Sequence, residues 1–109
     1  MWKIDKGHKT GTTTASYVTA LDWITAELRE KTVHLVNTHA SLSMYFKVLA
    51  KYHEDQTSTK EDTLVAETSL AAGEDTRIQF DRQYAEIIVQ VKNNSGAATY
   101  ELNYSGQGA

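Results

Sequence analysis

Hydrophobic and polar residues alternate along much of this sequence, and a period of two is typical of a half-buried β-strand. The longest such run covers residues 42–52, in which every second side chain is apolar or aromatic. Another run covers residues 85–91 and resumes over residues 100–104. Between its halves lies NNSG, residues 93–96, and Asn and Gly tolerate the backbone of a tight reversal. We therefore predict a β-hairpin over residues 84–104.

Shorter apolar periods predict further strands over residues 32–37, 63–70 and 76–80. The first of these strands and the long run at residues 42–52 form the arms of a second predicted hairpin, joined by a polar turn. The segment between His53 and Asp62 has no apolar residue, so we predict an exposed loop there.

Residues 17–31 fit two patterns. Their apolar side chains recur at intervals of three and four, as on one face of a helix. They also alternate near the start of the segment and include several β-branched residues, which are mediocre helix formers. We favour a strand over residues 17–21, followed by an irregular connection through Arg29.

Six to eight short strands with polar turns and no secure long helix indicate an all-β protein. The fold class that this pattern favours is an antiparallel β-sandwich, either immunoglobulin-like or jelly-roll-like. A chain of 109 residues is long enough for one such domain.

The charge of the chain is unevenly distributed. Residues 1–15 carry three lysines against one aspartate, a net charge of +2, whereas residues 16–109 carry −5. The first segment is rich in Lys, Gly and Thr and has no clear apolar period, so we predict a flexible basic arm at residues 1–15 and one domain at residues 16–109. Trp2 and Ile4 alternate with polar neighbours, which leaves a short edge strand as the alternative at the start.

Composition narrows the classes of partner. A net charge of −3 argues against nucleic acid, whose binding proteins usually present a basic surface. No apolar run approaches the ~20 residues that span a bilayer, so we expect no membrane partner. The chain has no cysteine, so it holds neither a disulfide nor a thiolate metal site.

The residues that could carry chemistry do not form a recognisable site. His34 and His39 flank one predicted hairpin, but no third metal ligand is apparent, and we interpret them as solvent-facing or hydrogen-bonded. The acidic residues of the 53–62 loop lack the spacing of a calcium loop. No nucleophile motif, phosphate loop or paired-acid cleft can be identified, so we predict neither an enzyme nor a cofactor.

Some apolar and aromatic side chains are predicted on faces that should meet water. Tyr45 faces away from the apolar row of residues 42–52, and Leu49 and Ile88 lie on the nominally polar faces of their strands. With Trp2 and Ile4 in the arm, they are our candidate interface residues. Isolated surface aliphatics remain the competing interpretation. Alternatively, Tyr45 and other aromatics form a stacking platform for sugar rings.

Three segments carry a resemblance to a known group of proteins. They are VHLVNTHASLSMYFKVLAKY (residues 33–52), SLAAGEDTRIQF (residues 69–80) and YAEIIVQVKNNSGAATYELNYSG (residues 84–106). Their order resembles the small β-sandwich proteins encoded among the virion genes of tailed bacteriophages, which decorate heads or build the neck and tail.

The resemblance implies a non-enzymatic viral structural protein, made in the host cytoplasm and incorporated into the virion. It would act by oligomerising, often as a trimer, and by docking onto a capsid or tail protein. A carbohydrate- or receptor-binding β-sandwich module is the alternative that the residues leave open.

Overall fold

The computed structural model describes residues 3–53, 62–81 and 84–108. Among these residues there is no helix long and apolar enough to cross a membrane. Eight strands account for the regular structure of the described residues: β1 (Lys3–Thr12), β2 (Val18–Ile24), β3 (Glu30–Asn37), β4 (Met44–Lys51), β5 (Asp62–Leu70), β6 (Asp75–Phe80), β7 (Glu86–Asn93) and β8 (Thr99–Gly108).

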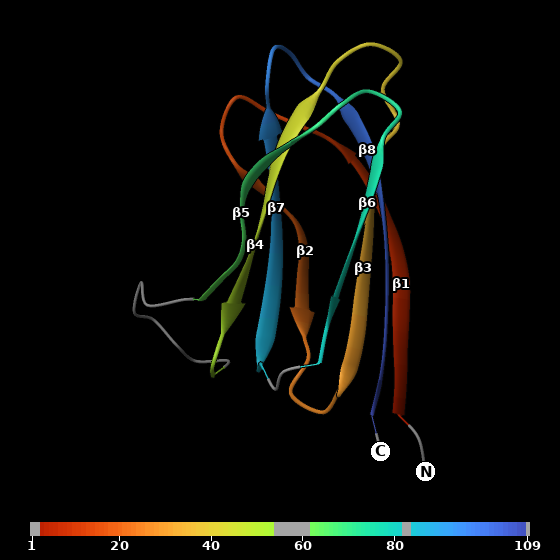
Figure 1. Ribbon diagram of the computed structural model, residues 1–109, viewed down its shortest axis with the longest axis vertical. Coiled ribbons are helices and arrows are strands. Elements are labelled where there is room, and N and C mark those ends of the chain that lie inside the picture. The colour runs from red at the N-terminus through yellow and green to blue at the C-terminus, as the bar shows by residue number, and fades with distance from the viewer. Residues whose placement is uncertain (1–2, 54–61, 82–83, 109) are drawn as a thin grey trace.

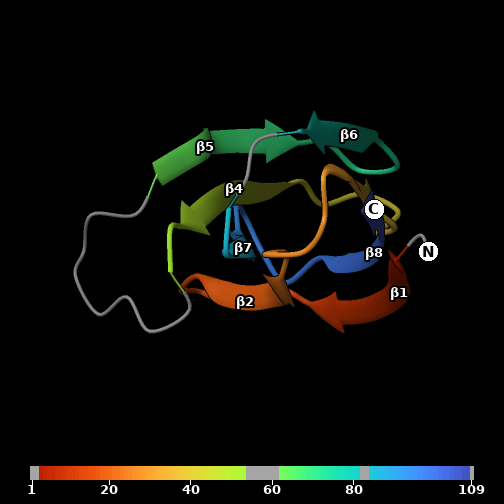
Figure 2. The same cartoon turned by 90° about the horizontal axis from the view of Figure 1, so that it is seen from below.

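The strands form two four-stranded antiparallel sheets that face each other (Figure 1; Figure 2). Sheet A has the order β1-β8-β3-β6, and sheet B has the order β2-β7-β4-β5. The pairs β1–β8, β2–β7, β3–β6 and β4–β5 thus fall alternately in the two sheets, as if one long hairpin were rolled up. This strand order is that of a jelly roll. The predicted antiparallel β-sandwich is confirmed, and the jelly-roll alternative is the one that the chain adopts.

Both predicted hairpins are wrong, although their strands are present. β7 lies in sheet B and β8 in sheet A, and β3 and β4 are divided between the sheets in the same way. The loop after β7 is bonded to the loop after β1: the Asn93 N–H donates to the Thr14 carbonyl (2.8 Å), and the Ala98 N–H donates to Thr13 Oγ1 (2.8 Å). The turn residues therefore carry the chain from one sheet to the other instead of closing a two-stranded ladder.

The apolar rows predicted from the alternation fill the space between the sheets. On β7, Ile87, Val89 and Val91 are fully buried, and they belong to one core cluster with the inward-facing residues of β3 and β8 in sheet A. Tyr52 departs from its predicted row: it is 60% exposed because β4 ends one residue earlier, so the alternation continues beyond the sheet.

The prediction of a flexible arm is wrong for residues 3–12, which form β1 and pair with β8 along the whole strand. Gly7 lies opposite Tyr104, and Gly11 lies opposite Tyr100. Each tyrosine ring occupies the space that a side chain on the facing glycine would need. The glycines are therefore places of close packing, and β1 belongs to the sandwich.

Two buried polar side chains tie down loops at the ends of the sandwich. The Asn37 side-chain amide donates to the carbonyls of Leu42 (2.8 Å) and Leu70 (3.0 Å). Lys31 points inward, and its Nζ donates to the Leu28 carbonyl (3.0 Å). Burial lowers the pKa of the Lys31 ammonium group.

The packing of β1 predicts the effect of adding a single methyl group. Gly7→Ala should lower the free energy of unfolding by about 1–3 kcal/mol, because the new Cβ overlaps the Tyr104 ring, which packs on Trp23. Thr10→Ala, at an exposed position of the same strand, should change it by less than about 0.5 kcal/mol. Urea unfolding measures both variants, and equal stabilities would contradict the close contact.

The assignment of faces on β7 predicts that Val89→Asp unfolds the domain. Val89 is fully buried, and an unpaired carboxylate at this position costs several kcal/mol against a total stability of ~5–15 kcal/mol. Circular dichroism should show loss of the cooperative thermal transition. An unchanged melting temperature would mean that Val89 does not face the core.

Candidate interaction surfaces

Three of the predicted interface residues lie on the outer face of sheet B. Leu49 of β4 and Ile88 of β7 are direct cross-strand neighbours there, and both are half-buried. Tyr45 is on the same face of β4, opposite Lys92. Their placement follows the alternation of the strands, and their participation in an interface stays a prediction.

Ile24 belongs to the same surface but was not predicted as an interface residue. It is 50% exposed at the end of β2, one row from Ile88. The β2–β7 register shifts between Thr19 and Leu21, so Leu21 and Trp23 face the core and Ile24 faces out. The only signal in the sequence is the residual alternation after that shift. We call Ile24, Leu49 and Ile88 the sheet-B apolar patch.

Of the two arm residues, Ile4 is not brought to this patch. Ile4 is 66% exposed and belongs to β1, at an edge of sheet A. Trp2 lies outside the described residues. The five predicted interface residues therefore do not form one continuous surface in a single chain.

Beside the patch, Tyr17 lies across the outer face of sheet B. Its hydroxyl donates a hydrogen bond to Glu67 of β5, the edge strand opposite to β2. Lys47 Nζ lies 4.2 Å and Lys92 Nζ 4.9 Å from the centre of the Tyr17 ring. Lys92 also forms an ion pair with Glu67 (3.4 Å). Tyr17 thus connects the two edges of the sheet through cation–π and hydrogen-bonding contacts.

These contacts shift the pKa values of both Tyr17 and Glu67. Burial raises the pKa of the Tyr17 phenol, and the hydrogen bond to Glu67 raises it further. The same hydrogen bond lowers the pKa of the Glu67 carboxyl group, with a further contribution from Lys92. The folded chain therefore favours a neutral phenol beside an ionised carboxylate.

Among the described residues, the aromatic side chains considered for sugar binding are divided between the core and the surface. Trp23 and Tyr100 are buried, and the Trp23 and Tyr104 rings pack at 4.9 Å. Lys92 Nζ lies 5.5 Å from the centre of the Tyr45 ring, on the outer face of sheet B. The most exposed aromatic ring of the described residues is Tyr52, whose hydroxyl donates to Asp62 (2.5 Å).

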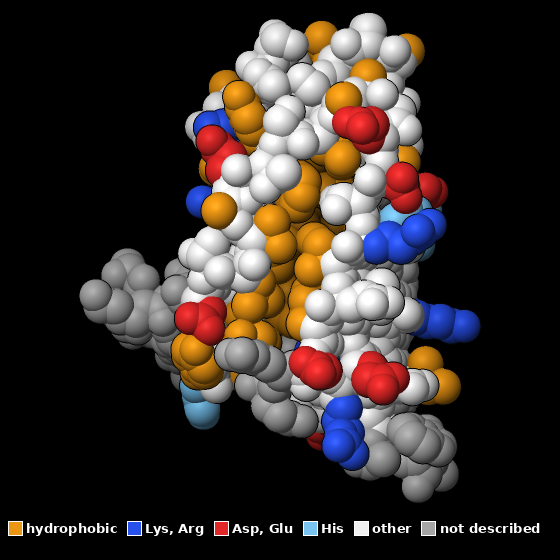
Figure 3. All heavy atoms as spheres, in the orientation of Figure 1, with side chains coloured by type: hydrophobic (Ala, Val, Ile, Leu, Met, Phe, Trp, Pro, Cys, Tyr) orange, Lys and Arg blue, Asp and Glu red, His pale blue; other side chains and the backbone are white. Residues whose placement is uncertain are grey.

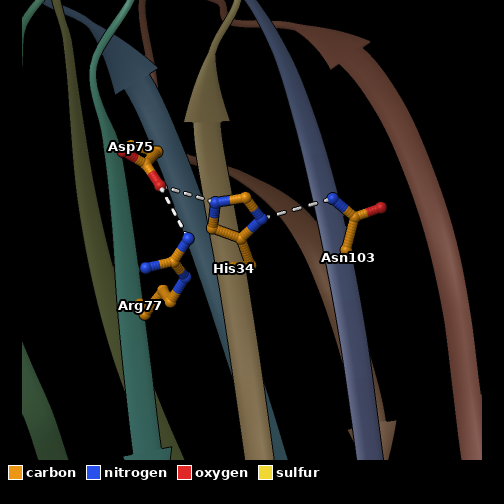
Figure 4. Close-up of polar contacts among 4 residues, drawn as sticks. All are labelled: His34, Asp75, Arg77 and Asn103. Carbon is orange, nitrogen blue, oxygen red and sulfur yellow. Dashed lines mark hydrogen bonds and ion pairs between the residues drawn. The ribbon is translucent and has the colours of Figure 1, made fainter.

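The outer face of sheet A carries a row of hydrogen-bonded polar side chains (Figure 4). His34 Nε2 lies 2.7 Å from Asp75 Oδ2, and Arg77 forms a longer ion pair with the same carboxylate (3.9 Å). Asn103 lies between His34 (3.5 Å) and His8 (2.6 Å). The hydrogen bond from His34 lowers the pKa of Asp75. The interpretation of His34 as a hydrogen-bonded surface histidine is confirmed.

No metal centre is formed by the described residues, in which no three His, Asp or Glu side chains gather closely enough. Most of the acidic loop considered for calcium lies outside the described residues. Asp62, at its end, accepts hydrogen bonds from Tyr52 and Tyr84.

A groove lies between β5 and β6, where the two sheets do not meet. Hydrophobic side chains are visible along the molecule between the sheets (Figure 3). The groove has a volume of about 450 Å³, and its apolar lining consists of Leu64 from β5, Ile78 and Phe80 from β6, and Tyr84. Asp62 and Asp81 also line it. We call it the edge groove.

No protein-family model matches the sequence, and no curated protein does. Solved structures do share the fold. The chain is similar to a Bacillus endospore appendage, described as a disulfide-linked pilus, with a TM-score of 0.68 and 14% identity over 99% of this chain and 88% of the other. It is also similar to the SPBc2 prophage-derived protein YomS, with a TM-score of 0.52 and 16% identity over 94% and 95% of the two chains.

A further similar structure is a chain of infectious bursal disease virus, Gx strain. The TM-score is 0.53 and the identity 11%, over 98% of this chain but 31% of the viral one. At these identities the comparisons establish the fold of the chain.

The Tyr17–Glu67 connection predicts how stability depends on pH. Because folding lowers the pKa of Glu67, the ionised carboxylate stabilises the folded chain, and this stabilisation is lost as acid protonates the carboxylate. Because folding raises the pKa of Tyr17, the neutral phenol stabilises the folded chain. This stabilisation is lost as the pH rises above about 10, where the phenol ionises more readily in the unfolded chain than in the folded one. Tyr17→Phe should therefore flatten the pH profile of the unfolding free energy at both ends.

Urea unfolding between pH 3 and 11 (about the range of both groups) measures this profile. Tyr45→Phe is the matched control, because it removes a phenol from the same face without removing the bond to Glu67. A Tyr17→Phe profile that runs parallel to the wild-type profile would contradict the connection.

Proposed function

We propose that this chain is a non-enzymatic structural subunit of a virion, either a capsid decoration protein or a head–tail assembly protein. It is made in the host cytoplasm and acts by associating with other copies and by docking onto a capsid or tail protein. The docking surface is the outer face of sheet B.

The sheet-B apolar patch is the observation that carries this proposal. Leu49 and Ile88 pair across the centre of a sheet face that no other strand of the described residues covers, and Ile24 extends the patch toward the β2 edge. A sandwich normally turns polar side chains outward on such a face. Protein interfaces usually have a core of apolar side chains enclosed by a polar rim.

Two further observations support a structural role. The jelly roll is shared with a pilus and with a chain of a virus, and a prophage-derived protein has a similar fold. Unlike the disulfide-linked pilus, however, this chain has no cysteine. Without disulfides, its contacts in an assembly would be stabilised mainly by the burial of apolar surface.

The test is whether the chain co-sediments with virus particles released from cells that carry its gene. A tagged full chain should travel with virus particles through a density gradient. Leu49→Lys combined with Ile88→Lys should leave the protein at the top of the gradient, because the interface would have to bury two ammonium groups.

Thr10→Lys combined with Ser105→Lys is the matched control, since it adds the same charge at exposed positions of sheet A. Both double variants must retain a cooperative thermal transition. Wild-type protein that stays at the top, or a patch variant that sediments like the control, would contradict the proposal. Glycan binding that is lost on Tyr45→Ala would instead favour the carbohydrate-binding alternative.

A further inference from the structure

The edges of the two sheets are not equally protected. Edge strands expose unpaired backbone groups, and proteins blunt them with bulges, charges or covering contacts. β2 has a register shift between Thr19 and Leu21, and the β4–β5 pairing has two shifts. β1 carries three lysines and is joined to β2 by the hydrogen bond from Trp23 to Asp5 (2.9 Å). β6 is short, but it pairs with β3 in an unbroken register and carries no lysine.

Alternate residues of β6 direct their backbone groups toward the free edge. The Asn37 N–H donates to the Glu74 carbonyl (2.9 Å), and the β3–β6 register continues from this pair. In an antiparallel ladder every second pair exchanges hydrogen bonds. The even-numbered residues of 76–80 therefore bond to β3, and the odd-numbered residues of 75–79 turn their N–H and C=O groups outward.

The side chains of β6 divide in the same way. Ile78 and Phe80 point into the edge groove and are half-buried. Arg77 is 71% exposed on the outer face, and Asp81 is exposed just beyond the strand. The free edge thus combines outward-facing hydrogen-bonding groups, an open apolar groove and two opposite charges.

We propose that β6 pairs with β6 of a second copy of this chain across a two-fold axis, so that sheet A becomes continuous over both copies. The strands run antiparallel, with Gln79 opposite its symmetry mate. This register places Arg77 opposite the partner's Asp81 and Ile78 opposite the partner's Phe80. The two-fold axis generates each of these pairs twice. The outward-facing backbone groups of one copy then face those of the other copy, so that they can form hydrogen bonds.

The charges of β6 select this register. Moving the axis to Arg77 would place two guanidinium groups opposite each other, and moving it to Ile78 would place Asp75 opposite the partner's Asp81. A register that pairs Asp75 with the partner's Arg77 would use a carboxylate that His34 already binds, and it would leave Phe80 without an apolar partner. The edge is therefore complementary to a second copy of itself.

This contact deepens the proposed function by naming one interaction between copies, and it lies on a different sheet from the proposed docking patch. Cross-linking tests it directly, because the chain has no native cysteine. In the full chain, Gln79→Cys should form a disulfide-linked dimer under mild oxidation, since the facing Cα atoms would lie about 5.5 Å apart. Thr10→Cys, at an exposed position of the other edge of sheet A, should remain largely monomeric.

Charge exchange tests the register. Sedimentation velocity from about 10 μM to about 1 mM should show a dimer that forms with increasing concentration. Arg77→Asp alone, or Asp81→Arg alone, should weaken it by about tenfold or more, because like charges then face each other. The variant with both substitutions should recover dimerisation, which also shows that loss in the single variants is not unfolding.

A monomer at every concentration, a trimer or an open-ended polymer would overturn the β6 pairing. So would equal cross-linking of the two cysteine variants, or a double charge variant that stays monomeric. None of these results affects co-sedimentation through the sheet-B patch, so failure of the β6 pairing and failure of the proposed function are distinguishable.

Discussion

The burial of one apolar face from every inner strand, against the facing sheet, is the constraint on which this structure depends. Val33 and Leu35 of sheet A and Val48 and Val89 of sheet B are fully buried, and none of these rows could be covered within its own sheet. The strand order meets this need, because rolling the paired strands alternately into two sheets buries all the rows against one another. The loops bonded by Thr13 and Asn37 then hold the crossings between sheets in place.

The period-two pattern predicted the strands well because each inward position is set by local alternation. It could not predict pairing, since the same alternation results whether the chain turns back beside itself or crosses to the other sheet. That is why residues 84–104 were wrongly predicted as a hairpin. The flexible arm was predicted partly from a Gly-rich composition, because the tyrosine rings that pack on Gly7 and Gly11 come from β8, far away in the sequence.

The candidate surfaces were predictable to different degrees. Leu49 and Ile88 stand out from sequence, because an aliphatic residue in a polar row is visible without any partner. Ile24 does not, because a register shift in β2 changes which residues face outward. The edge groove also leaves no local signal: Leu64 and Ile78 follow the ordinary pattern of inward residues, and only the separation of β5 from β6 exposes them.

In the proposed assembly, the contacts use two features that the jelly roll leaves uncovered: an apolar patch on sheet B and a regular free edge on sheet A. Amide hydrogen exchange followed residue by residue by NMR tests this most directly. In dilute protein, Thr76, Ile78 and Phe80 should be protected while Arg77 and Gln79 exchange freely, and at high concentration the latter two should also become protected. If Arg77 and Gln79 stay unprotected at every concentration, or if protection does not alternate along β6, the account of a free edge completed by a second copy is wrong.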